Sequence, residues 1–145
     1  MNRTLSIEKK IKFNAAKSKV WDALVNPEKI KEYLFGTEVI SDWKEGSAMI
    51  FQGEWEGKKY RDKGNIFVIQ PENFFQYNYW SRFSGLEDNE ENYSIVSYQI
   101  EEEGDQTVLT LIQQGFANEQ AKEHSEISWG MILEKMKEIV EQKIH

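Results

Sequence analysis

The strongest constraint on the fold is a series of six strand-like segments joined by very short turns. Between residues 37 and 115, β-forming residues alternate or cluster in six runs, and Gly, Pro, Asn or Asp stand in most of the breaks between them. Connections this short form hairpins, so neighbouring strands are expected to be antiparallel. The predicted strands are Thr37–Trp43, Ser47–Trp55, Lys58–Gln70, Asn73–Phe83, Asn92–Glu103 and Gln106–Gly115.

Helical patterns lie on both sides of this series. A first strand, Thr4–Phe13, precedes two short helices; Asn14 or Ser18 is expected to cap the first, and Asn26-Pro27 to begin the second. Apolar residues at spacings of three and four then predict one long helix over Asn118–Lys143. The pattern predicts an α+β helix-grip fold, a seven-stranded curved antiparallel sheet around a long C-terminal helix.

Length and composition narrow the class of protein. The 145 residues fit one domain over 1–145, large enough to fold without disulfides, and the chain has no cysteine. The net charge of −7 disfavours binding to nucleic acid, which needs a basic face. No segment approaches the roughly 20 apolar residues of a membrane span. We therefore expect a cytoplasmic protein that does not insert into membranes.

The acidic residues are unevenly distributed. From Phe83 to Ala121 the chain has no Lys or Arg but nine Asp and Glu residues. This stretch is either a docking face for a basic partner or a solvated rim that keeps the protein soluble.

Aromatic residues are the main candidates for a binding site. Nineteen of the 145 residues are aromatic, and eleven of them lie between Trp43 and Phe83. Alternate residues of a strand share one face, and apolar walls with a few polar tips are typical of small-molecule pockets. The candidate ligand-binding residues, on the concave face of the sheet and on the long helix, are Phe51, Trp55, Phe67, Phe75, Tyr77, Tyr79, Tyr98, Leu111, Gln113, Trp129 and Leu133. The alternative is that these rings fill the interior and leave a narrow void.

Few polar residues stand out as candidates for chemistry. Asp62 with Arg61 or Arg82 is a candidate buried ion pair, with a solvent-face pair as the alternative, and Arg82 is a candidate cation at the pocket rim. His124 is a candidate proton shuttle or an exposed helical residue. The sequence has neither a nucleophile elbow nor a Gly-rich phosphate loop, and one usable His makes a metal site improbable. We expect no cofactor and no catalytic residues.

Several motifs, in order, resemble the START-like (SRPBCC) superfamily, and more narrowly the domain family named after the activator of the heat-shock-protein-90 ATPase. The resemblance covers nearly the whole chain. It is carried by Val20-Trp21-Asp22-Ala23-Leu24, Asn26-Pro27-Glu28-Lys29-Ile30, Asp42-Trp43-Lys44-Glu45-Gly46, Asp62-Lys63-Gly64-Asn65-Ile66, Gln70-Pro71, Tyr77-Asn78-Tyr79-Trp80, Thr107-Val108-Leu109-Thr110-Leu111, Gln113-Gln114-Gly115-Phe116, Trp129-Gly130 and Leu133. The resemblance implies a helix-grip fold. It transfers no catalytic motif.

Three functions remain open. The first is binding of a small, mostly apolar, lipid- or polyketide-like ligand between sheet and long helix, oriented by Tyr77, Tyr79, Tyr98 and Gln113. The second, implied by the resemblance alone, is a module that stimulates a chaperone ATPase through its surface, with a chaperone or another protein as partner. The third is a cyclase-like enzyme that uses a pocket Tyr, Asp62 or His124 as general acid. An enzyme is the less favoured reading.

Overall fold

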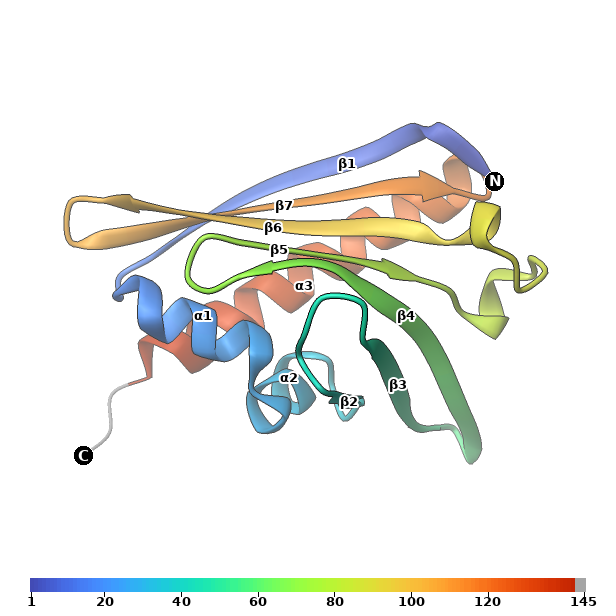
Figure 1. The fold of residues 1–145 in the computed structure, drawn as a ribbon, viewed down its shortest axis with the longest axis horizontal. Helices are drawn as coiled ribbons and strands as arrows, with labels where there is room; N and C mark the ends of the chain where they lie inside the picture. The colour runs from blue at the N-terminus through green and yellow to red at the C-terminus, as the bar shows by residue number, and fades with distance from the viewer. Residues whose placement is uncertain (143–145) are drawn as a thin grey trace.

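The structure, a computed structural model, describes residues 1–142 and contains one curved antiparallel sheet of seven strands (Figure 1). The strand order is β1-β7-β6-β5-β4-β3-β2, so β1 and β2 form the two edges. This order confirms the predicted series of antiparallel hairpins, because each strand from β2 to β7 lies next to its neighbour in sequence. The strands are β1 (Asn2–Phe13), β2 (Glu38–Ser41), β3 (Ala48–Trp55), β4 (Lys58–Gln70), β5 (Phe74–Tyr79), β6 (Ser94–Glu103) and β7 (Gln106–Phe116).

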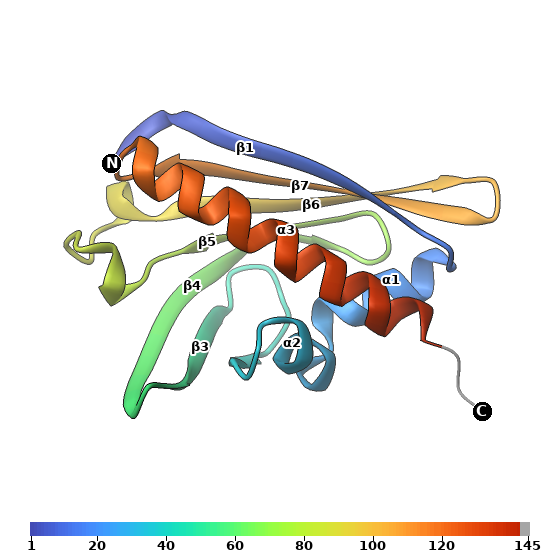
Figure 2. The same cartoon turned by 180° about the vertical axis from the view of Figure 1, so that it is seen from behind.

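Helices cover the concave face of the sheet. The long helix α3 (Glu119–Glu141) crosses this face, and α1 (Lys17–Val25) and α2 (Pro27–Tyr33) lie beside it toward its C-terminal end (Figure 2). The hairpin of β3 and β4 extends beyond the helices (Figures 1 and 2). The predicted α+β helix-grip architecture is therefore confirmed.

Helix ends follow the capping chemistry of the sequence only in part. The side chain of Asn26 accepts from Glu28 N at 3.1 Å and begins α2, as predicted. The first helix instead has Ala16 at its N-cap, with no side-chain hydrogen bond, so the prediction of Asn14 or Ser18 was wrong. Asn118 caps α3 by accepting from Ala121 N at 2.8 Å. The predicted last helical residue, Lys143, lies outside the described residues.

Two strands, β2 and β5, end earlier than predicted. The backbone turns at Trp43, which has a φ of 56°, so β2 ends before it. The strand expected to reach Phe83 ends at Tyr79, and the 3₁₀ turn η1 (Arg82–Ser84) follows, begun by the Ser81 hydroxyl. As a result, Trp43 and Phe83 lie outside the strands, and the alternation of faces along a strand does not determine where their rings point.

The sheet bends where β4 meets β5. Their register shifts between Ile66 and Val68. At Gly64 a Cβ atom would overlap the carbonyl oxygen of Asn78, so only glycine allows the two backbones to come this close. The side chain of Asn78 also accepts from Asn65 N at 2.6 Å. This bend directs the β3–β4 hairpin away from α3.

Candidate functional site

The interior between sheet and helices is a cluster of aromatic rings centred on Phe75. Trp21 and Trp43 each lie 6.2 Å from it, measured between ring centroids, and Tyr77 lies 5.3 Å away on the same strand. Tyr98 stacks on Phe75 at 6.2 Å and meets Trp129 of α3 edge to face at 6.1 Å. Aromatic pairs at these separations attract each other beyond the area they bury. The cluster therefore joins strands β5 and β6 to helices α1 and α3.

Most of the predicted site residues meet in this interior. Those placed there, buried or half-buried, are Phe51, Phe75, Tyr77, Tyr79, Tyr98, Leu111, Gln113, Trp129 and Leu133. The period of two along β5, β6 and β7 correctly placed the six of these side chains that lie on those strands.

Trp55 and Phe67 are corrections to the predicted concave wall. Trp55 is 66% exposed, because it ends β3 at the tip of the hairpin that extends beyond the helices. Phe67 is 41% exposed, because the register shift beside it leaves the inward position to Ile66. Neither ring lines the interior.

The space left in the interior is small. A void of about 30 Å³ lies where α2, β2, β3 and Trp129 meet, and its lining includes Tyr33, Phe51, Tyr77 and Tyr98. This volume is that of about one water molecule, whereas small-molecule pockets measure about 300–1,000 Å³. The expected ligand-sized hollow is therefore not open in this structure, and the aromatic rings fill the grip.

Burial keeps the interior tyrosines neutral. Burial raises the pKa of Tyr77 to about 12 and raises the pKa values of Tyr33 and Tyr98 well above 10.0. The pKa of Tyr79 is also raised well above 10.0, first by burial and then by the negative charge of Asp62. These hydroxyls are therefore hydrogen-bond donors at every physiological pH, and the Tyr33 hydroxyl donates to Ala23 O at 2.9 Å.

Gln113 joins the long helix to the sheet. Its Oε1 accepts from Trp129 Nε1 at 2.6 Å and from Ser125 Oγ at 2.9 Å, both on α3. Its Nε2 donates to Ser94 Oγ on β6 at 3.1 Å. The predicted ligand-orienting amide thus already has three protein partners.

Asp62 is buried but forms no ion pair among residues 1–142. It is 5% exposed, and its Oδ2 accepts from the Tyr79 hydroxyl at 2.5 Å. Its Oδ1 is buried without a hydrogen-bond partner in the described part of the chain. The candidate pair with Arg61 or Arg82, buried or on the solvent face, is therefore not formed in this range, and Tyr79 takes the partner's place.

Other predicted features have simpler placements. His124 is exposed on α3, whereas the tyrosines and Asp62 are buried.

Among residues 1–142, no group of three or more His, Asp or Glu side chains is placed to hold a metal ion. No helix in this range combines the length and apolar character of a membrane span. A cytoplasmic location stays a prediction from the sequence.

The acidic loop before β6 is held to the body of the protein. Asp88 forms an ion pair with Lys63 and accepts from the Tyr93 hydroxyl at 2.5 Å. The pKa of Asp88 is lowered by its hydrogen bonds from Lys63 and Tyr93. Arg3 donates to the backbone oxygens of Glu90, Glu91 and Tyr93 at 2.8–3.1 Å. Part of the acidic stretch therefore has a structural role.

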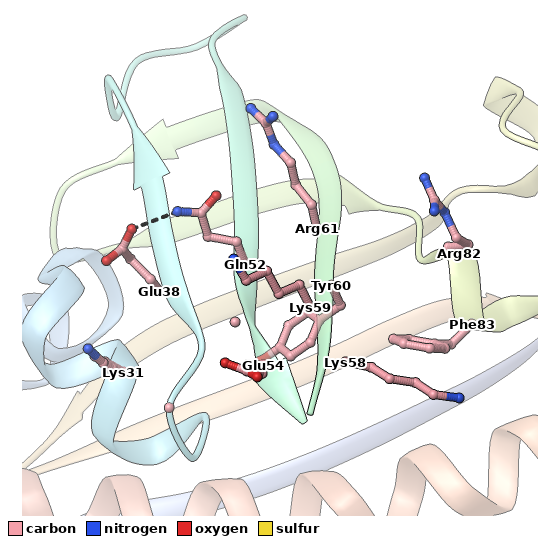
Figure 3. Close-up of a pocket in the computed structure, with 12 residues that line it drawn as sticks. Lys31, Glu38, Gln52, Glu54, Lys58, Lys59, Tyr60, Arg61, Arg82 and Phe83 are labelled. Carbon is pink, nitrogen blue, oxygen red and sulfur yellow. Dashed lines mark hydrogen bonds between the residues drawn. The ribbon is translucent and has the colours of Figure 1, made fainter. Parts of the chain in front are cut away.

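A large open groove lies at the protruding hairpin, and sequence reasoning missed it. It measures about 720 Å³ and lies between α2, β2, the β3–β4 hairpin and η1 (Figure 3). We call it the cationic groove. Its charged lining residues are Lys31, Lys58, Lys59, Arg61, Arg82, Glu38 and Glu54, beside the rings of Tyr60 and Phe83. Of these, only Arg82 was predicted, as a cation at a pocket rim; the run Lys58-Lys59-Tyr60-Arg61 was the available signal.

A meander sheet closed by one long C-terminal helix over an aromatic interior defines the helix-grip class of START-like proteins. The sequence model of a family in this class, described as activator of Hsp90 ATPase homolog 1-like protein, matches residues 14–141. The chain belongs to this family.

Solved structures give the same fold. ChR145 from Cytophaga hutchinsonii is 42% identical, with 97% of each chain covered and a TM-score of 0.83. CalU16 from Micromonospora echinospora is 23% identical, with 94% of this chain and 76% of that chain covered and a TM-score of 0.75. PFC0360w, an HSP90 activator from Plasmodium falciparum, is 16% identical, with 94% and 96% covered and a TM-score of 0.75. A search of curated protein sequences found no match.

Proposed function

We propose that this protein binds a small, mostly apolar ligand between its sheet and α3, and that the ligand enlarges the void beside α2. The observation that carries the proposal is the void itself, which is lined by apolar side chains together with the tyrosines Tyr33, Tyr77 and Tyr98. Such a lining offers a large apolar area and a few neutral hydrogen-bond donors, which is the composition of small-molecule sites.

The place of the void indicates how it enlarges. One side of the void is formed by Ile30 and Tyr33 of α2 and by Leu34, which caps the C-terminal end of that helix. The helix has only seven residues. A short helix has fewer packing contacts to break than a long one, so its local opening costs less free energy. Movement of α2 away from Phe51 and Met49 opens the interior without disturbing the hydrogen bonds that hold α3 at Gln113.

A thermal-shift and native mass-spectrometry screen tests the proposal. The probes are 1-dodecanol, a flexible apolar chain, and 1,8-dihydroxyanthraquinone, a flat one. A ligand present at about 100 times its Kd stabilises the fold by about 2.7 kcal/mol, which raises the melting temperature by roughly 5 °C or more. We expect one of the probes to give this shift together with a 1:1 complex.

Matched variants locate the binding. Met49 lines the void, so Met49→Phe fills it and removes the shift, whereas Met131→Phe on the exposed face of α3 leaves the shift unchanged. If neither probe binds near its solubility limit, or if both variants bind equally well, the proposal fails.

A second function is supported by the family and by the fold shared with PFC0360w, an HSP90 activator. In this alternative the chain stimulates a chaperone ATPase through its surface, with the acidic stretch around Glu87–Glu91 as the docking face. The test measures the ATPase rate of the chaperone at low salt with and without the protein. An unchanged rate and failure to co-purify contradict this alternative, and neither result depends on ligands of the interior.

A further inference from the structure

The cationic groove is a separate site from the interior void of the proposed function. The residues that line it and those that line the interior void do not overlap. Its volume of about 720 Å³ lies within the 300–1,000 Å³ of small-molecule pockets, whereas the void holds about one water molecule. The groove is therefore open to a ligand without any movement of the chain.

The charge of the groove opposes that of the molecule. Five of its lining side chains are basic and two are acidic, in a chain with a net charge of −7. None of the five forms an ion pair in the described part of the chain, and Glu38 is engaged by Gln52 Nε2 at 2.9 Å. A concave surface lined mainly by one sign of charge focuses the electrostatic field and concentrates ions of opposite charge.

The groove also has an aromatic wall built into the hairpin. Tyr60 meets Phe83 edge to face, with ring centroids 6.4 Å apart, and its hydroxyl shares a hydrogen bond of 2.5 Å with Thr37. Tyr60 lies over Gly53, where a Cβ atom would come within 2.5 Å of the Tyr60 hydroxyl oxygen. Phe83 is 66% exposed, an apolar ring left facing water beside Arg82. A single exposed ring is ordinary on a protein surface, but this one borders an open groove lined by basic side chains.

We infer that the cationic groove binds an organic anion with a flat apolar body, such as an aromatic carboxylate or sulfonate. The rings of Tyr60 and Phe83 take the flat body, and the acid group lies against the basic side chains that line the groove, Lys58 and Arg82 among them (Figure 3). A volume of about 720 Å³ is the size of a small-molecule site, which a compact organic anion fills. The inference does not depend on an interior ligand.

Two probes that differ only in their acid group test the inference. 8-Anilino-1-naphthalenesulfonate carries a sulfonate, and N-phenyl-1-naphthylamine has the same rings without it. We expect the sulfonate to bind about tenfold more tightly, as removal of one charge-assisted contact implies. Its affinity falls with added salt, while that of the neutral probe does not. Amide chemical shifts in a ¹⁵N NMR titration are expected to move at the groove, including Gly36 and Gly53.

Variants with equal net charge separate the groove from general electrostatics. The double variant Lys58→Gln with Arg82→Gln is expected to lose about tenfold in sulfonate affinity. The control pair, Lys10→Gln with Lys19→Gln, removes the same charge from exposed sites outside the groove and leaves the affinity within about twofold. Phe83→Ala is expected to lower the affinity for both probes. Met49→Phe, which fills the interior void, leaves sulfonate binding unchanged.

Three outcomes overturn the inference. The first is equal affinity for the two probes, and the second is an equal effect of the two double variants. The third is stronger competition from an acidic peptide, a hexaglutamate, than from 1-naphthoate, which assigns the groove to a protein partner.

Discussion

The interior beneath α3 and the cationic groove are both lined with aromatic rings, but the rings have different roles in the two places. In the interior, Phe75 and its neighbours are buried and leave a void of about 30 Å³. In the groove, Phe83 is exposed beside cations that form no ion pair within residues 1–142 and beside an open volume of about 720 Å³. Burial of an aromatic side chain stabilises the fold by a few kcal/mol, whereas an exposed ring contributes almost nothing. The difference separates aromatic residues that hold the fold from those left free for a ligand.

The largest effect is expected at the centre of the interior. Phe75→Ala removes a ring that contacts Trp21, Trp43, Tyr77 and Tyr98, and it leaves a cavity in a close-packed core. We expect the free energy of unfolding to fall by about 3–5 kcal/mol, measured by urea denaturation. A loss below about 1 kcal/mol would mean that the interior is loosely packed and that the contrast with the groove is false.

Alkaline pH tests the interior by a different route. The pKa of Tyr77 is raised to about 12, and those of Tyr79 and Tyr98 are also raised well above 10.0, so above pH 10 the folded state keeps protons that the unfolded state releases. Their contribution to stability is complete below pH 10 and is lost as the pH rises from about 10 toward the folded-state values. The expected slope is about 1.4 kcal/mol per pH unit for each tyrosine.

Urea unfolding between about pH 9 and pH 11.5 measures this slope. Tyr98→Phe removes one titrating group, so its slope is shallower than that of the unsubstituted chain. A slope that Tyr98→Phe leaves unchanged would contradict the assignment of the loss to the interior tyrosines.

An intermediate effect is expected at the joint between helix and sheet. Gln113→Ala leaves Trp129 Nε1, Ser125 and Ser94 without their partner, which costs about 1–3 kcal/mol. Gln114→Ala is the matched control, because Gln114 is exposed and, within residues 1–142, its side chain forms only one long hydrogen bond, of 3.5 Å, to Arg3 O. The emission of the five tryptophans reports any change around Trp129. Equal losses in the two variants would count against a special role for Gln113.

The smallest effect is expected in the groove. Phe83→Ala changes the free energy of unfolding by no more than about 0.5 kcal/mol, because the ring is already exposed. Urea denaturation beside Phe75→Ala gives the comparison directly. A loss of 2 kcal/mol or more would mean that Phe83 is part of the core. The groove would then lack an exposed aromatic ring for a ligand.

The sequence predicted the fold well because its signals are local. The turn residues and the two-residue alternation set the strand order, and parity placed Phe75, Tyr77 and Tyr98 inward. Alternation fails where the sheet departs from a straight ladder: at the bulge beside Phe67, and at Trp55, beyond the reach of α3. A strand pattern shows which face a residue takes but not whether another element covers that face.

The groove was harder to predict because four separate segments form it. Arg82 and Phe83 were expected in a strand, and the 3₁₀ turn that brings them beside Tyr60 depends on the early end of β5. The size of the interior void was also beyond the sequence, since it depends on how closely the rings interlock. Partners such as Gln113 with Trp129 and Asp62 with Tyr79 lie at least 16 residues apart, and only the folded register brings them together.

The two edges of the sheet bear on how the protein behaves at high concentration. An edge strand has unpaired backbone groups that can template a strand of another molecule, which is the start of fibril growth. Here β2 has only four residues, too few for a stable pairing, and β1 carries exposed charged side chains such as Glu8 and Lys10 along its twelve residues. The fold thus has built-in protection against edge-to-edge aggregation, and that protection is independent of any ligand.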